Sequence, residues 1–172
     1  MTRHPQRAAF TLIELLIAVA IVGILASLAI PTFSGYVYRS RVSEAVNFLG
    51  EIKTRQEAYW GRFGQYAAVN GTDWTDYTPD DIPGVDPVGW TSELEWEQLG
   101  AFPPGPVRFR YATIAGAPGE IAPASSNLDE RDFWYAAQAE GDLDGDGDSF
   151  ILEVYSQSRI MYNSAAGSGG WE

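Results

Sequence analysis

The stretch that decides the fold is Ala9-Phe10-Thr11-Leu12-Ile13-Glu14-Leu15, which opens a long apolar run near the start of the chain. From Leu15 to Tyr38 the sequence holds 24 residues without a charged side chain. About 20 apolar residues suffice for a helix to cross the hydrocarbon core of a bilayer. The pattern therefore predicts a membrane-spanning helix that carries a single carboxylate, Glu14, near its N-terminal end.

The carboxylate of Glu14 is energetically unfavourable inside the predicted membrane segment. A charged group inside a membrane segment costs about 2.5–3.5 kcal/mol on insertion scales, so such a residue is expected to have a partner and a function. Three basic residues precede the apolar run: Arg3, His4 and Arg7. A short basic leader followed by an apolar helix indicates a segment that is directed to a membrane.

This N-terminal pattern resembles that of the type IV prepilins, and the residues from Ala9 to Leu15 carry the resemblance. Gly23 and Pro31 fall where pilins have a helix-loosening glycine and proline. The resemblance implies that a prepilin peptidase cuts between Ala9 and Phe10 and that Phe10 is then N-methylated. Alanine stands here where the family usually has glycine before the cut. Residues 1–9 would be the cleaved leader.

The resemblance also implies a function and a location. Glu14 would pair with the terminal amine of a neighbouring subunit, and the chain would self-associate into a helical type IV pilus filament, or fimbrium. Before assembly it would be a single-pass protein of the inner membrane that meets the pilus assembly platform. Afterwards it would be extracellular, with a part in cell adhesion or motility. A pseudopilin of a type II secretion system, in a periplasmic pseudopilus, is the alternative within the same family.

A hypothesis from another class explains the apolar run as a cleaved signal peptide. Ser27-Leu28-Ala29 fits a small-x-small cleavage site, which would release a secreted calcium-binding module that begins at Ile30. Against this, Glu14 lies inside the apolar core and the apolar run continues past Ala29. A plain membrane anchor is a third possibility, but it accounts for neither Glu14 nor the residues around it.

The roughly 110 residues that follow the long N-terminal helix are enough for one small domain. Cysteine is absent, so no disulfide can close the C-terminal region. The net charge is +3 for residues 1–62 and −15 for residues 63–172, which together give the −12 of the whole chain. Because nucleic-acid binding depends on a basic surface, we expect no nucleic-acid partner.

The periodicity of the sequence predicts an α+β fold, in which one long helix packs on a small antiparallel sheet. We expect the filament-core helix over residues 10–38, with a kink or local melting at Pro31. An amphipathic continuation is expected over residues 39–64. Its apolar stripe contains Ala45, Phe48, Leu49, Ile52, Gln56, Tyr59 and Phe63.

The rest of the chain is predicted to hold a variable loop and a sheet. Residues 65–106 form the loop, which is rich in Pro and Gly, is attached by tryptophans and contains one short helix over residues 91–99. Within the sheet region, residues 107–162, alternation predicts strands at 107–113, 132–139, 150–155 and 159–162. A helix from Ser126 is the alternative for the second strand. Residues 163–172 are expected to be a flexible tail.

One further motif indicates a metal site. Asp142, Asp144 and Asp146 occupy alternate positions, Asp148 follows, and Glu153 stands at the twelfth position, as in a calcium-binding loop. Alternate oxygen ligands converge on one hard cation. The other interpretation is an Asp- and Gly-rich turn between two strands. Calcium is thus a candidate cofactor, and no other is indicated.

The sequence gives little support for an enzyme. The only histidine, His4, lies in the predicted leader, and cysteine is absent. No Gly-x-Ser-x-Gly elbow or phosphate-binding loop occurs, and zinc lacks its preferred ligands. We therefore expect no catalytic residues.

Overall fold

The structure is a computed structural model of the chain. It describes residues 10–163 except for residues 92, 124, 125 and 127. The predicted leader, residues 1–9, lies outside the described residues, as does the predicted tail apart from Asn163. The chain divides into two compact units, Met1–Val37 and Tyr38–Glu172. Helix α1, Leu12–Phe63, supplies the described helix of the first unit and the first element of the second.

Helix α1 is one continuous α-helix of 52 residues. It runs through both Gly23 and Pro31, so the local melting that we considered at Pro31 does not occur. Two hydroxyl groups that follow Pro31 bond to carbonyls one turn earlier: Thr32 Oγ1 donates to the Leu28 carbonyl at 3.0 Å, and Ser34 Oγ donates to the Ile30 carbonyl at 3.0 Å. Such bonds from serine and threonine hydroxyls compete with the regular bonds of the helix and often bend it. A kink at Gly23 or Pro31 stays a prediction.

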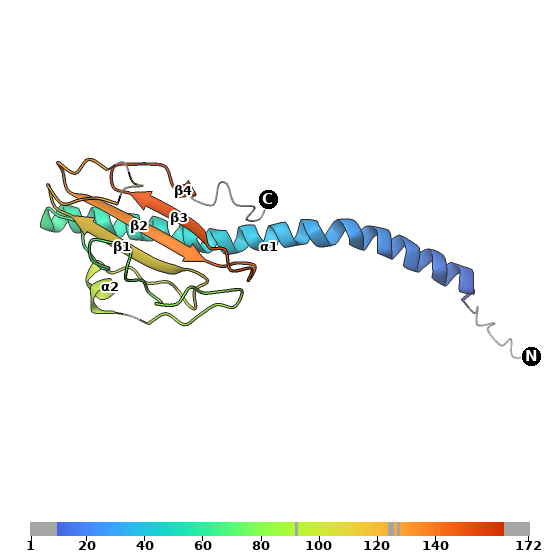
Figure 1. The fold of residues 1–172 in the computed structure, drawn as a ribbon. Coiled ribbons are helices and arrows are strands. Elements are labelled where there is room, and N and C mark those ends of the chain that lie inside the picture. The colour runs from blue at the N-terminus through green and yellow to red at the C-terminus, as the bar shows by residue number, and fades with distance from the viewer. Residues whose placement is uncertain (1–9, 92, 124–125, 127, 164–172) are drawn as a thin grey trace, which may run out of the picture. The chain divides into compact units, whose positions relative to one another are not determined.

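The second unit is an α+β domain, as the sequence predicts. Strands β1 (Arg110–Gly116), β2 (Trp134–Gly141), β3 (Phe150–Tyr155) and β4 (Tyr162–Asn163) form one antiparallel sheet in chain order. Figure 1 shows this sheet beside the C-terminal part of α1. Because side chains alternate along a strand, one face of the sheet packs on the helix and the other faces away.

The predicted stripe of α1 forms the core together with the sheet. Ala45, Leu49 and Ile52 are fully buried, and Phe48 is nearly so. They pack in one apolar cluster with Phe109, which lies just before β1, and with the sheet residues Tyr111, Ala137, Ala139, Phe150, Leu152 and Val154. Gln56 is also fully buried, whereas Phe63 at the end of the stripe is 53% exposed. The stripe therefore leaves the core in the last turn of the helix.

The observed bounds of β1, β2 and β4 differ from the predicted ones. Strand β3 has the predicted bounds, and the strand interpretation of residues 132–139 is confirmed by β2, which begins and ends two residues later. Strand β1 starts three residues late because Val107 pairs instead with Val88 of the loop, in both directions at 2.8 Å. Strand β4 covers Tyr162 and Asn163, at the end of the predicted fourth strand.

The variable loop is held on the domain by aromatic side chains. Helix α2, Leu94–Leu99, ends at Gly100, whose φ of 76° lies in the left-handed region that glycine adopts readily. As expected, Trp96 and Leu99 of α2 are buried. The Trp96 ring Nε1 donates to Thr78 Oγ1 at 2.9 Å, and Trp90 packs edge-on against Phe48 with centroids 5.6 Å apart. The loop is therefore ordered by the core of the domain.

Candidate functional site

Glu14 lies in the first turn of α1, where it forms a reciprocal pair with Thr11. The Thr11 amide donates to Glu14 Oε2 at 2.9 Å, and Thr11 Oγ1 donates to the same oxygen at 2.7 Å. The Glu14 amide in turn donates to Thr11 Oγ1 at 3.3 Å. A threonine followed three residues later by glutamate is a capping box, which satisfies amides that the helix leaves unpaired. The carboxylate is therefore fixed relative to the first turn.

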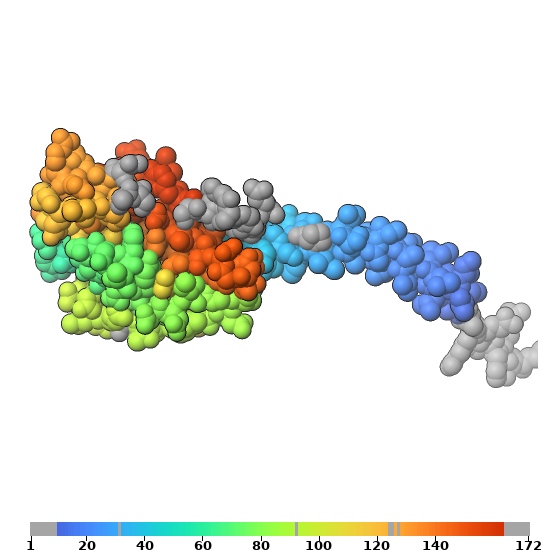
Figure 2. Space-filling view, in the orientation of Figure 1, coloured from blue at the N-terminus to red at the C-terminus, as the bar shows by residue number. Residues whose placement is uncertain are grey.

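The surface of α1 around Glu14 is apolar and open. Among the described residues, α1 is the one helix that is long and apolar enough to cross a membrane. Phe10, just before it, is 79% exposed, while Ala9 on the other side of the predicted cleavage lies outside the described residues. Figure 2 shows the apolar helix in blue. Its exposed large side chains include Leu12, Ile13, Leu15, Leu16, Ile17, Val19, Ile21, Val22, Ile24, Leu25, Leu28 and Ile30.

The acidic loop joins β2 to β3 and brings three carboxylates together. Single oxygens of Asp142, Asp144 and Asp146 all lie within 4.8 Å of one another. Asp142 also shapes the loop, because its Oδ1 accepts from the Gly145 amide at 2.7 Å and its Oδ2 from the Gly147 amide at 3.1 Å. Gly145 and Gly147 have φ of 79° and 93°, which other residues adopt rarely. Three converging carboxylates are a suitable donor set for a hard cation.

The close approach of these carboxylates affects their ionisation. Desolvation, followed by the charge of Asp146 and, more weakly, that of Asp142, raises the pKa of Asp144. The charge effects have the sign expected for like charges that share a small volume. A bound cation would remove this repulsion.

Two predicted ligands are not part of this group. Asp148 and Glu153 do not belong to the set of converging oxygens. Glu153 lies on β3, where alternation puts its side chain on the face of the sheet that is turned away from α1. Its Oε1 accepts from Gln138 Nε2 at 2.6 Å and its Oε2 from the Tyr155 hydroxyl at 2.6 Å. In this structure the residue at the twelfth position of the motif is bonded within the sheet, and a role of Asp148 or Glu153 as a calcium ligand stays a prediction.

The acidic loop is anchored at its N-terminal side. The Asp142 amide donates to the Pro83 carbonyl at 3.0 Å, which ties the loop to the variable loop. The Leu143 carbonyl accepts from Arg41 Nη1 of α1, and the Leu143 side chain is buried in the core. Helix, variable loop and acidic loop therefore meet in the second unit.

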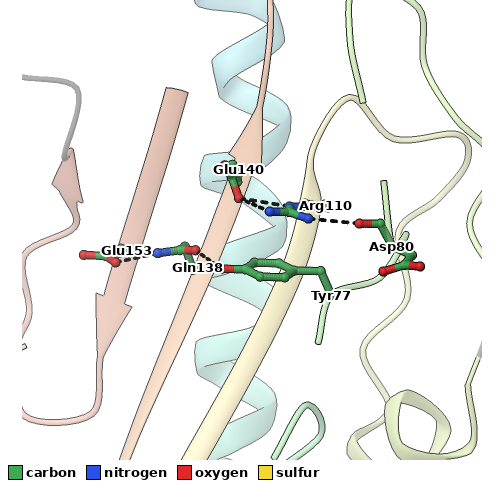
Figure 3. Close-up of polar contacts among 6 residues, drawn as sticks. All are labelled: Tyr77, Asp80, Arg110, Gln138, Glu140 and Glu153. Carbon is green, nitrogen blue, oxygen red and sulfur yellow. Dashed lines mark hydrogen bonds and ion pairs between the residues drawn. The ribbon is translucent and has the colours of Figure 1, made fainter. Parts of the chain in front are cut away.

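A polar network crosses the outer face of the sheet (Figure 3). The Tyr77 hydroxyl donates to Gln138 Oε1, and Gln138 donates to Glu153. Beside this chain, Arg110 Nε and Nη2 donate to Glu140 Oε2 at 2.9 and 2.7 Å. Arg110 Nη1 also donates to the Asp80 carbonyl at 2.9 Å. The network joins the loop near residues 77–80 to β1, β2 and β3.

This network and a contact from α1 stabilise a domain that lacks cysteine. The Arg110 guanidinium lies 4.0 Å from the centroid of the Tyr77 ring. Lys53 Nζ of α1 donates to the Ser158 carbonyl at 2.8 Å, in the turn after β3. Burial raises the pKa of Tyr77 to about 12, and the Glu140 charge adds to the rise. Tyr77 therefore stays a hydrogen-bond donor at neutral pH.

The sequence patterns missed several of these residues. The spacing of Thr11 and Glu14 is itself the signature of a capping box, so that pair was open to prediction. The partners Tyr77 and Gln138 are 61 residues apart, and Arg110 and Glu140 are 30 apart. No local pattern indicates such a pair before the strand order is known.

Comparison with known proteins identifies the N-terminal segment. Residues 5–30 match the family described as the prokaryotic N-terminal methylation motif. Fimbrial protein EcpC of Eikenella corrodens is 48% identical over 70 residues, which are 41% of this chain and 45% of that protein. Type IV major pilin protein PilE1 of Neisseria gonorrhoeae is 40% identical over 75 residues, 44% of this chain and 46% of that protein.

A third relative extends the comparison. Type IV major pilin protein PilA of Myxococcus xanthus is 44% identical over 64 residues, 37% of this chain and 29% of that protein. The matched regions thus span less than half the length of each of these relatives. No solved structure matches the chain.

The fold and the N-terminal segment define a class of protein: an α+β domain on a long apolar helix, with a methylation motif at its start. Within that class, the N-terminal segment of this chain is similar to those of proteins named as type IV major pilins and a fimbrial protein.

Proposed function

We propose that this chain is a structural subunit of a type IV pilus. The observation that carries the proposal is the placement of Glu14, a single carboxylate in the first turn of an exposed apolar helix. A carboxylate there is unfavourable in lipid, whereas in a filament it has a use as the partner of a neighbour's amine. The motif over residues 5–30 and the relatives that are named as pilins support the same function.

Assembly would proceed from a membrane-anchored precursor. A prepilin peptidase would cut between Ala9 and Phe10 in the inner membrane, and the new terminus at Phe10 would be methylated. On the assembly platform, the apolar helices would leave lipid and pack against one another. The acidic domain, which carries most of the net negative charge, would face outward. No catalytic step of this chain is required.

The alternatives receive less support. A secreted module beginning at Ile30 would divide α1, which is one continuous helix from Leu12 to Phe63. A pseudopilin would share the same helix and processing, but the relatives reported above are named as pilins or fimbrial proteins. These relatives favour the pilus.

Replacement of Glu14 by valine tests the proposal. Because valine enters lipid more easily than glutamate, Glu14→Val should accumulate in the membrane at the wild-type level yet yield few filaments. The measurement is the amount of sheared filament relative to the membrane pool. Mass spectrometry of the wild-type subunit should show a chain that begins at methylated Phe10. Normal filament yield from Glu14→Val, or a mature chain that begins at Ile30, would overturn the proposal.

We also propose that the acidic loop binds calcium through Asp142, Asp144 and Asp146. Their convergence within 4.8 Å supports a shared cation, and the charge of Asp146 that raises the pKa of Asp144 is the repulsion that a cation would relieve. Calcium would tie the ends of β2 and β3 together in a domain that has no disulfide. Calorimetric titration of the protein with calcium tests this second proposal.

A further inference from the structure

Both hydrogen-bond donors of Thr11 end on the same oxygen of Glu14. The amide and the hydroxyl reach Oε2 at 2.9 and 2.7 Å. Within the described part of the chain, no hydrogen bond to Oε1 of Glu14 is present. The pair is therefore asymmetric: one carboxylate oxygen is held by the subunit's own first turn, and the other is left to accept from outside.

The donors that hold Glu14 are uncharged, so they leave its negative charge uncompensated. Residues 10–38 contain no lysine, arginine or histidine. Neutral donors lower the cost of placing a carboxylate in an apolar medium without removing its attraction for a cation. An amine supplied by another subunit would thus meet a carboxylate that is both charged and already fixed in position.

Fixing the carboxylate in advance has an entropic consequence. A glutamate side chain loses rotamer freedom when it is ordered, and this loss opposes any contact that it makes. The ring formed by Thr11 Oγ1, Glu14 Oε2 and the two backbone amides imposes that order before assembly. A preorganised group binds its partner more tightly than a mobile one.

We propose that Thr11 is a positioning residue for subunit pairing: it holds Glu14 through Oε2 and presents Oε1 to the terminal amine of a neighbouring subunit. This inference rests on the proposed function as a pilus subunit. It assigns the threonine hydroxyl a role in assembly, in addition to its role as a helix cap.

The experiment compares Thr11→Val with Thr11→Ser in the full chain, with Glu14→Val as a reference. Valine has nearly the shape of threonine but removes the hydroxyl, while serine retains it. Filament yield is measured relative to the processed, methylated pool in the membrane, because Thr11 lies close to the cleavage site. Thr11→Val should lower the yield several-fold, to a level between those of the wild type and Glu14→Val, and Thr11→Ser should restore it.

A second measurement follows the carboxylate itself. In the full chain labelled with carbon-13 glutamate and held in detergent micelles, the NMR signal of the Glu14 carboxyl carbon should move in Thr11→Val and return in Thr11→Ser. This signal reports whether the hydroxyl holds the carboxylate, and the filament yield reports whether that hold matters for assembly.

The outcomes separate the inference from the proposed function. Normal assembly of Glu14→Val would overturn the proposed role of Glu14 itself. If Glu14→Val blocks assembly while Thr11→Val assembles at the wild-type yield, the inference about Thr11 alone is wrong. Equal losses in Thr11→Val and Thr11→Ser would also overturn it, because the hydroxyl would then not be the cause. An unchanged carboxyl signal in Thr11→Val decides against it whatever the processing efficiency.

Discussion

Gln56 of α1 donates to Thr113 Oγ1 of β1 at 3.0 Å, and both residues are fully buried. The same amide group of Gln56 donates to the Ala67 carbonyl at 2.8 Å and accepts from the Ala67 amide at 2.9 Å. One polar side chain in the apolar stripe thus fixes the chain reversal after the helix and aligns that reversal with the sheet. The stripe predicted from the sequence includes Gln56 because this position must face the sheet.

Replacement of Gln56 by leucine should destabilise the domain. Leucine fits the apolar surroundings but leaves the Ala67 amide and carbonyl without their partner, and an unpaired buried polar group costs about 1–3 kcal/mol. Urea unfolding of a soluble fragment over residues 39–172 measures the change, since this unit has its own core. Gln65→Leu, at an exposed position just after the helix, is the matched control and should change the free energy of unfolding by less than about 0.5 kcal/mol.

Loss of Arg110 should be more damaging than loss of another arginine in an ion pair of the same length. Arg110 and Glu140 have side chains that are 21% and 12% exposed, with the nitrogen and oxygen 2.7 Å apart. Arg110→Met would leave the Glu140 carboxylate largely buried and unpaired, so we expect a loss of about 2–4 kcal/mol. Arg131→Met breaks a pair of the same length whose side chains are 89% and 45% exposed, and should cost less than about 1 kcal/mol. Equal losses of stability in Arg110→Met and Arg131→Met would contradict the idea that burial makes the Arg110 pair more important.

The domain should lose stability in alkaline solution through Tyr77. Burial and the Glu140 charge raise its pKa from 10.0 to about 12, so the folded state holds its proton more tightly than the unfolded state. The stabilisation from this group is complete below pH 10.0 and is lost as the pH rises towards 12. Unfolding by urea at about pH 9 and about pH 11 measures the decline.

Tyr77→Phe is the variant that tests this assignment. Phenylalanine should lower stability at neutral pH, because Gln138 loses its donor, and should reduce the alkaline decline. Some decline should remain, because burial also raises the pKa of Tyr111 and Tyr135. A decline as steep as that of the wild type would exclude Tyr77 as its source.

Local patterns predicted much of the fold, because a helix or a strand repeats its apolar residues at a fixed spacing that is visible over a short stretch of sequence. The stripe from Ala45 to Gln56 and the alternation in β3 are examples. The network on the outer face of the sheet was not predictable in this way, since it depends on which strands become neighbours. Glu153 shows the limit most clearly: its spacing fits a calcium loop, but the strand directs its side chain to Gln138 and Tyr155.

Calcium should raise the melting temperature of the 39–172 fragment through Asp142, Asp144 and Asp146. A ligand that binds only the folded state stabilises it by RT ln(1 + [L]/Kd), about 2.7 kcal/mol at a hundredfold excess over Kd. Asp144→Ala removes one of the three converging oxygens and should abolish the rise. Thermal unfolding with and without millimolar calcium, together with calorimetric titration, measures the effect. Absence of binding at millimolar calcium would show that the loop is only a turn.

Glu153→Gln separates this site from the sequence motif that first indicated it. If the ligands are the three aspartates alone, Glu153→Gln should keep the full calcium-dependent rise in melting temperature. The variant should still melt at a lower temperature than the wild type without calcium, because Glu153 is 92% buried and accepts from both Gln138 and Tyr155. A calcium response that disappears in Glu153→Gln as well as in Asp144→Ala would return Glu153 to the coordination sphere. That result would require β3 to turn its side chain towards the loop when the ion binds.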